Sequence, residues 1–182
     1  MGNFAIRIEH GSRKGVKVSD GFSKEGARIT TSANRCVLFN VLRNKLYLDF
    51  NNLVCADLCC GSGVVGFECL SLGAKKCLFV DCDKEKLKSI NIAINKTGFC
   101  GETNYAYLPS WEHNERFDLI FFDPPYENNF CERMIKIIYE DNLLADNGIL
   151  IVETKKDINV EKYNVLSINK LKNGAKFYFL SR

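Results

Sequence analysis

Short apolar runs alternate with stretches of helical periodicity from about residue 53 to the end of the chain. Runs of strand length, most of them nearly continuously apolar, lie at 53–58, 76–81, 103–108, 117–123 and 148–154. The segments between them have the spacing of helices, at 64–73, 84–98 and 130–144. This pattern predicts an α/β fold with a doubly wound, mostly parallel sheet that helices cover on both faces.

The last two apolar segments, 163–168 and 175–181, flank the turn-forming sequence Asn-Lys-Leu-Lys-Asn-Gly. They predict an antiparallel pair that closes the sheet. Ligands of doubly wound folds bind at the carboxyl ends of the parallel strands. We therefore expect three polar segments to meet there, at 57–63, Asp81 and 123–126.

The first 50 residues have a different pattern. Gly11 and Gly15 mark the turns of a predicted β-hairpin or short meander, and a helix capped at Thr31 or Ser32 follows it. The apolar stripe of this helix is expected at Val37, Leu38, Val41 and Leu42.

Charge separates the same two parts of the chain. The net charge of +3 hides nine Lys and Arg against three Asp and Glu in residues 1–45, and 16 against 19 in the remainder. We predict that residues 1–50 form a basic arm docked on a domain spanning 51–182. Such an arm favours a polyanionic partner, with a solvated basic surface as the alternative.

Composition narrows the class of protein. With 182 residues, 46% of them hydrophobic and 26% charged, the chain has the profile of a soluble domain. It has no apolar run of membrane-spanning length and no secretory signal, so we expect a cytoplasmic protein. The nine cysteines lack Cys-x-x-Cys spacing, so we expect no metal site and mostly buried thiols.

The segment 61–66, Gly-Ser-Gly-Val-Val-Gly, matches G-x-G-x-x-G, and Asp81 follows at the end of the next strand. This arrangement suits an adenosine ribose in either a dinucleotide or S-adenosylmethionine. Asp57 favours S-adenosylmethionine, because a carboxylate there would neutralise an ammonium group and repel a pyrophosphate. The predicted cofactor-binding residues are Asp57, Cys59, Gly61, Ser62, Gly63, Asp81 and Cys82.

The sequence Asp123-Pro124-Pro125-Tyr126 ends a hydrophobic strand. This segment can be interpreted either as a strand-terminating turn or as a rigid platform for a planar ligand. As a platform, the Asp123 carboxylate and the Pro124 carbonyl would accept the two N–H bonds of a nucleobase amine and localise its lone pair. The prolines would fix this geometry, and Tyr126 would stack on an unstacked base.

These motifs resemble the bacterial RsmD-like 16S rRNA guanine-N2 methyltransferases over nearly the whole chain. The most specific match is DLCCGSGVVGFECLSLGA at 57–74, followed by FVD at 79–81 and DPPY at 123–126. The arm departs from the family pattern at Ile29, Ser32, Ala33 and Cys36. The resemblance implies a Rossmann-like methyltransferase fold and S-adenosylmethionine-dependent methylation of a guanine N2 amine. It also implies 16S rRNA as partner, in a small ribosomal subunit or assembly intermediate, with the enzyme a metal-free monomer.

Other residues receive weaker assignments. Predicted RNA contacts are Arg13, Lys14, Arg28, Thr30 and Arg35, and Arg28 and Arg35 have surface ion pairs as their alternative. Ser110 or Trp111 is expected beside the adenine, and Glu153 near the site. Asn40 is expected either to line the site or to cap local backbone, and Phe122 to lie in the core.

Three rival functions stay open. A DNA adenine-N6 methyltransferase could use the same DPPY chemistry, although the chain leaves no room for a sizeable target-recognition domain. A nucleotide-cofactor oxidoreductase would use the glycine loop alone. A non-catalytic RNA-binding relative is the third, and the intact Asp123 and Tyr126 argue against it.

Overall fold

A seven-stranded sheet forms the centre of the computed structural model, which describes residues 5–20, 30–111, 113–125 and 129–182. The strand order is β5-β4-β3-β6-β7-β9-β8. Neighbouring strands pair in parallel from β5 through β4, β3 and β6 to β7. Strand β9 runs antiparallel to both β7 and β8. The strands are β3 (Val54–Leu58), β4 (Lys76–Asp81), β5 (Gly101–Tyr105), β6 (Phe117–Phe122), β7 (Leu144–Thr154), β8 (Asn164–Lys170) and β9 (Lys176–Ser181). The predicted mostly parallel sheet with an antiparallel end is confirmed.

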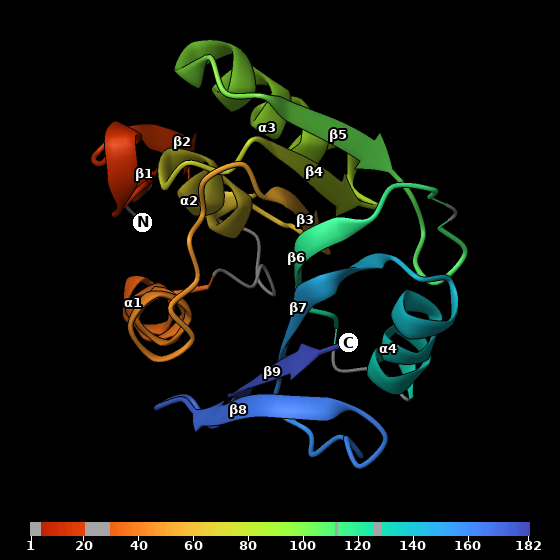
Figure 1. The fold of residues 1–182 in the computed structure, drawn as a ribbon. Helices are drawn as coiled ribbons and strands as arrows, with labels where there is room; N and C mark the ends of the chain where they lie inside the picture. Colours follow the sequence, from red (N-terminus) through yellow and green to blue (C-terminus); the bar gives the residue numbers. More distant parts are fainter. Residues whose placement is uncertain (1–4, 21–29, 112, 126–128) are drawn as a thin grey trace.

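Helices cover both faces of the sheet, as Figure 1 shows. One hydrophobic cluster joins the sheet to α1 (Ser32–Asn40), α2 (Val64–Ser71) and α3 (Lys84–Thr97), and the other joins it to α4 (Phe130–Glu140). The segment between β5 and β6 contributes Trp111 to the α4 side, where its ring stacks near Phe117. Among the described helices, none is long and apolar enough to cross a membrane.

The N-terminal segment forms the predicted hairpin from β1 (Ala5–Arg7) and β2 (Lys17–Asp20), joined through the 3₁₀ turn η1 (Gly11–Arg13). Thr31 is the N-cap of α1, and its hydroxyl accepts a hydrogen bond from the Asn34 backbone N–H at 3.2 Å. A π-helical turn, η2 (Val41–Lys45), continues α1. Apolar residues of the hairpin, of α1 and of η2 belong to the same cluster as α2 and the sheet.

Three details of the sequence prediction are wrong. Val37 is 36% exposed and Phe39 is buried instead, because α1 turns Asn34, Arg35 and Leu38 inward. The strand predicted at 103–108 is β5, which starts and ends earlier. The helix predicted at 130–144 ends at Glu140, and β7 already begins at Leu144. Phe117 pairs with Leu144 and Leu119 pairs with Ile149, so the extra residues of β7 form an irregularity in the ladder.

The fold brings the predicted site residues to one place. The chain leaves the central strand β3 towards β4 and β5, then returns to β6 on the other side of β3. The strand order therefore reverses between β3 and β6, and in open α/β sheets this switch point opens a crevice at the carboxyl ends of the strands.

Candidate functional site

A cavity of about 470 Å³ lies at the carboxyl ends of β3, β4 and β6. The three acidic residues predicted to meet there, Asp57, Asp81 and Asp123, all line this cavity. Its other described lining residues are Thr30, Cys59, Cys60, Gly61, Ser62, Val64, Val65, Cys82, Lys86, Ala106, Tyr107, Leu108, Phe121, Pro125 and Phe130. The predicted convergence of three sequence-distant motifs is therefore present in the structure.

The loop between β3 and α2 is a tight turn made of left-handed residues. Gly61 and Gly63 have φ values of +54° and +69°, and Cys59 has φ +56° although it is not glycine. The Gly63 N–H donates to the Cys60 carbonyl at 2.7 Å, which closes the turn. At Gly66, an added Cβ would lie 2.4 Å from the Phe79 ring, so this glycine lets α2 pack closely on β4.

Asp81 closes the loop from the side of β4. Its Oδ2 accepts the Gly61 N–H at 2.9 Å, and its Oδ1 accepts the Asp83 N–H at 2.9 Å. The Lys86 ammonium lies 3.7 Å from Oδ1. A carboxylate has about four lone-pair positions, so Asp81 keeps acceptor capacity for ligand hydroxyl groups.

Asp57 is almost completely buried beneath the loop. Its Oδ2 accepts the Gly66 N–H at 3.0 Å, which ties the end of β3 to the first turn of α2. Burial raises the pKa of Asp57 well above its usual value, and the nearby Asp123 and Asp81 carboxylates raise this pKa further, against the Gly66 hydrogen bond. Three carboxylates at one cavity favour a cationic ligand over a polyphosphate.

Replacing Asp57 with Asn is expected to stabilise the fold and weaken cofactor binding. Because the folded-state pKa is raised, the native state of the wild-type protein binds the proton more tightly. Its stability should therefore fall as pH rises above the unfolded-state pKa of about 4. The Asn variant lacks this dependence, so its advantage in melting temperature should be largest at pH 7 and should shrink towards pH 4. Thermal unfolding at several pH values tests this, and an advantage that grows as pH falls would contradict it.

The segment after β6 forms the third wall. The Asp123 backbone N–H donates to the Leu58 carbonyl at 3.4 Å, which aligns the end of β6 with that of β3. Pro124 is buried, whereas Pro125 is exposed and lines the cavity together with Phe130. Tyr126 lies outside the described residues, so its stacking role stays a prediction.

The predicted cofactor residues are gathered at the cavity. Asp57, Cys59, Gly61, Ser62, Asp81 and Cys82 line it, and Gly63 shapes the turn beside it. The residues predicted beside the adenine differ from those that line the cavity. Ser110 and Trp111 are absent from the described lining, and Ala106, Tyr107 and Leu108 take their place because Trp111 packs into the core.

The predicted RNA-contact residues have different surroundings. Arg13 and Lys14 are exposed, and Thr30 lines the cavity. Arg28 lies outside the described residues. Arg35 departs from the prediction, because it is only 4% exposed and is held in ion pairs with Glu9 and Glu68.

Other candidates have mainly structural surroundings. Asn40 is exposed and accepts a hydrogen bond from the Asn44 side chain, outside the cavity. Glu153 is buried at the end of β7 and accepts a hydrogen bond from Asn34 Nδ2 at 3.3 Å. Phe122 is fully buried, as predicted. Four of the nine cysteines are buried, fewer than predicted, and all nine are free thiols.

Sequence reasoning missed several lining residues. Lys86 and Tyr107 follow β4 and β5 within a few residues, so position after a strand was the available signal. Phe121 and Phe130 belong to an apolar strand and helix, and nothing in their pattern separates them from core residues.

Comparisons with known proteins agree with this geometry. The family described as "Conserved hypothetical protein 95" matches residues 6–181. Ribosomal RNA small subunit methyltransferase D of Haemophilus influenzae is 31% identical over 159 residues, which cover 84% of this chain and 80% of that protein. The protein of the same name from Escherichia coli strain K12 is 29% identical over 161 residues, with 85% and 77% covered.

Two solved structures share the fold over 98% of both chains. The structure of yhhF from Escherichia coli has a TM-score of 0.81 at 25% identity. That of HI0767 from Haemophilus influenzae has a TM-score of 0.75 at 26% identity. With the profile match over nearly its whole length, the chain belongs to the family described as "Conserved hypothetical protein 95", which includes the ribosomal RNA small subunit methyltransferase D proteins.

Proposed function

We propose that this protein methylates the exocyclic N2 amine of a guanine in small-subunit (16S) rRNA, with S-adenosylmethionine as methyl donor. One observation carries the proposal: Asp57, Asp81 and Asp123 surround a single cavity built on a glycine loop. Its relatives named as small-subunit rRNA methyltransferases support rRNA as the substrate. We further propose that the protein acts as a cytoplasmic monomer on the small subunit or an assembly intermediate.

The residues of the cavity fit S-adenosylmethionine. When bound, this cofactor supplies a methyl group on a positively charged sulfonium. Asp81 would accept hydrogen bonds from its ribose hydroxyls, and Asp57 would balance the charge of its ammonium group. The left-handed turn at Gly61 and Gly63 would let the loop backbone approach the ligand closely.

One part of the cavity wall is formed by the residues that follow β5. Ala106, Tyr107 and Leu108 line the cavity there, and Tyr107 is 65% exposed. Apolar contacts of this kind, with few polar groups, are typical of pockets for planar ligands. We assign these three residues to the adenine ring.

Asp123 would hold the amine that is methylated. Its carboxylate and the Pro124 carbonyl would each accept one N–H bond, which directs the nitrogen lone pair into the cavity. Once methylated, this nitrogen is transiently cationic, and one of its N–H bonds breaks as it releases a proton. Because a cationic nitrogen loses a proton readily, Asp123 does not need to be a strong base. Two consecutive prolines limit the motion of this segment, so little reorganisation accompanies the reaction.

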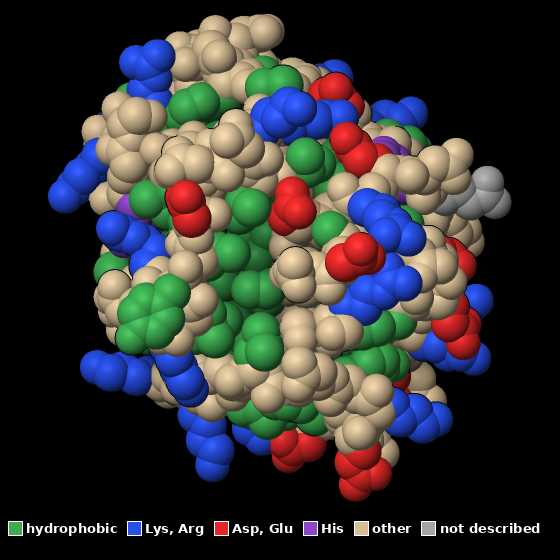
Figure 2. Space-filling view, in the orientation of Figure 1, with side chains coloured by type: hydrophobic (Ala, Val, Ile, Leu, Met, Phe, Trp, Pro, Cys, Tyr) green, Lys and Arg blue, Asp and Glu red, His purple; other side chains and the backbone are tan. Residues whose placement is uncertain are grey.

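Exposed cations of the arm would contact the RNA backbone. Figure 2 shows Lys and Arg side chains intermixed with Asp and Glu on the right of the drawn face, and with few acidic side chains among them on the left. We therefore expect several separate basic residues to guide the RNA. Arg13 and Lys14 are exposed on the turn between β1 and β2.

Replacing both Arg13 and Lys14 with Ala is expected to weaken RNA binding and its dependence on salt. If both contact phosphates, the slope of log K against log salt should fall by about 2 in magnitude. Affinity for S-adenosylmethionine should not change. Filter binding at several salt concentrations measures the slope, and Lys96→Ala, an exposed lysine of α3, is the control. An unchanged slope in the double variant would remove both residues from the RNA interface.

Methyl transfer to different nucleic acids tests the proposed substrate. Purified protein with labelled S-adenosylmethionine would receive unmethylated small subunits, naked 16S rRNA and duplex DNA in parallel. Label in subunits or rRNA alone is the expected result. Label in DNA alone would favour the adenine-N6 alternative, and tighter binding of NAD than of S-adenosylmethionine would favour an oxidoreductase.

A further inference from the structure

A buried ionic network lies outside the cofactor cavity, between α2 and the N-terminal hairpin. Its centre is Glu68, which is 0% exposed in a helix whose residues are all buried. Glu68 Oε1 accepts the Glu9 N–H at 2.8 Å, and Oε2 accepts the His10 N–H at 2.9 Å. The ring Nδ1 of His10 lies 3.1 Å from Oε2. Both carboxylate oxygens are therefore used to hold the hairpin against α2.

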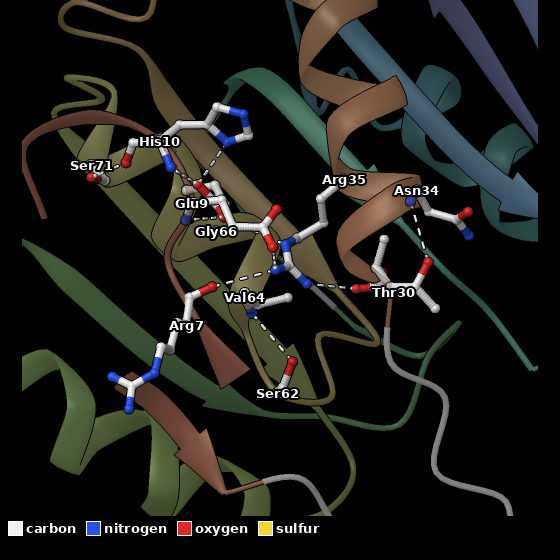
Figure 3. Close-up of polar contacts among 12 residues, drawn as sticks. Arg7, Glu9, His10, Thr30, Asn34, Arg35, Ser62, Val64, Gly66 and Ser71 are labelled. Carbon is white, nitrogen blue, oxygen red and sulfur yellow. Dashed lines mark hydrogen bonds and ion pairs between the residues drawn. The ribbon is translucent and has the colours of Figure 1, made fainter. Parts of the chain in front are cut away.

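Arg35 supplies the positive charge that this buried carboxylate needs. Its Nε lies 3.4 Å from Glu68 Oε1, and its Nη2 lies 2.6 Å from Glu9 Oε1. Nη2 also donates to the Arg7 carbonyl at 3.3 Å, and Nη1 donates to the Thr30 carbonyl at 2.8 Å. Figure 3 shows the guanidinium between the hairpin residues and Thr30.

Thr30 connects this network to the cavity. It is 8% exposed, and it is the one lining residue that the described part of the arm contributes. It directly precedes Thr31, the N-cap of α1. Arg35 donates a hydrogen bond to the Thr30 carbonyl, and its guanidinium is also paired with Glu68 of α2. These two contacts together fix Thr30 at the cavity wall relative to α2.

The same helix also serves the cofactor loop. Val64 and Val65, in the first turn of α2, line the cavity, and the Gly66 N–H bonds to Asp57. Glu68 lies in the next turn. The Glu68–Arg35 pair therefore sets the position of the arm relative to the helix that shapes the cofactor site.

We propose that Arg35 is a positioning residue that holds Thr30 at the cavity wall, so that the arm presents the target nucleotide to the methyl donor. This inference rests on the proposed function. This role requires arginine in particular, because a planar guanidinium can contact Glu9 and two carbonyls in fixed directions while it faces the Glu68 carboxylate. A lysine ammonium has three donors at one point. The exposed arm residues would bind RNA, and Arg35 would act through Thr30.

A double-mutant cycle tests this proposal. Arg35→Lys and Thr30→Val are each expected to lower kcat/KM for RNA by about 10-fold, because misplacement by about 1 Å can cost up to 100-fold. The double variant should have the same kcat/KM as Arg35→Lys alone, because both changes disturb the same contact of Thr30 at the cavity wall. The Kd for S-adenosylmethionine should stay within about 3-fold, a limit well below the expected activity losses. Arg43→Lys, at an exposed arginine of η2, is the matched control and should match the wild type.

Two results of the activity measurements would overturn the proposal. Effects of Arg35→Lys and Thr30→Val that multiply would mean that the residues act independently. A lower melting temperature for Arg35→Lys with unchanged kcat/KM would mean that Arg35 only stabilises the fold.

Amide hydrogen exchange keeps the test independent of RNA methylation. Arg35→Lys should speed hydrogen exchange at the backbone amides of Asn34 and of residue 35, which donate to Thr31. Exchange of the α3 amides should not change. If the wild-type protein methylates no RNA, the proposed function fails, while unchanged exchange in this variant would overturn the positioning role alone.

Discussion

Asp123→Asn is expected to lower kcat for methyl transfer by about 10²- to 10⁴-fold, the range typical for loss of one positioned acceptor or proton carrier. The Asn side chain keeps one acceptor oxygen, but it loses the negative charge and places an N–H₂ group where the amine must bind. The Kd for S-adenosylmethionine should change little, because the cofactor contacts that we propose are those of Asp57 and Asp81. Single-turnover kinetics with saturating cofactor, together with calorimetric titration, separates these two quantities.

The control for this variant is Asp146→Asn. Asp146 is a highly exposed residue of β7 that pairs with Arg116, and its replacement should leave kcat unchanged. Near-normal turnover of Asp123→Asn would remove Asp123 from the reaction. A parallel loss of cofactor affinity would instead place it among the cofactor contacts.

Glu68→Met is expected to destabilise the protein by about 3–5 kcal/mol, the usual result of removing one partner of a buried ion pair. The change leaves the Glu9 and His10 N–H groups without their acceptor and the Arg35 guanidinium with Glu9 as its carboxylate partner. For a chain of this size each kcal/mol shifts the melting temperature by about 2–4 °C, so a fall of roughly 6–20 °C is expected. Differential scanning calorimetry measures it.

An exposed ion pair provides the comparison. Glu85 and Lys88 lie 2.7 Å apart on the surface of α3, and both side chains are more than two-thirds exposed. Glu85→Ala should leave the melting temperature nearly unchanged, because exposed pairs contribute little. If Glu68→Met and Glu85→Ala behave alike, the buried network does not hold the hairpin to α2.

The sequence predicted the site better than it predicted what supports the site. Asp57, Asp81 and Asp123 each lie at or next to the end of a nearly continuous apolar strand, and parallel topology alone brings such strand ends together. The mostly parallel sheet and the closing antiparallel pair followed from the same pattern. The ends of α4 and β7 did not, because the residues from 141 to 148 suit either a turn or an irregular strand.

Arg35 and Glu68 show where sequence reasoning fails. Both are charged residues, which suggested a surface position for Arg35, and they lie on helices far apart in the chain. A usable signal was present, since Glu68 is the one charged residue in the apolar segment 64–71. A helix that is apolar all round is buried, so a carboxylate within it needs a buried partner. Only the tertiary structure identifies that partner.

Identification of the methylated nucleoside tests whether this cavity methylates a guanine N2 amine. The wild-type protein and Asp123→Asn would be incubated with unmethylated small subunits and S-adenosylmethionine, and the rRNA would be digested to nucleosides for mass spectrometry. We expect N2-methylguanosine with the wild-type protein and only a trace with the variant. Methylation at another position, or an equal yield of N2-methylguanosine from both proteins, would contradict the role given to this cavity and to Asp123.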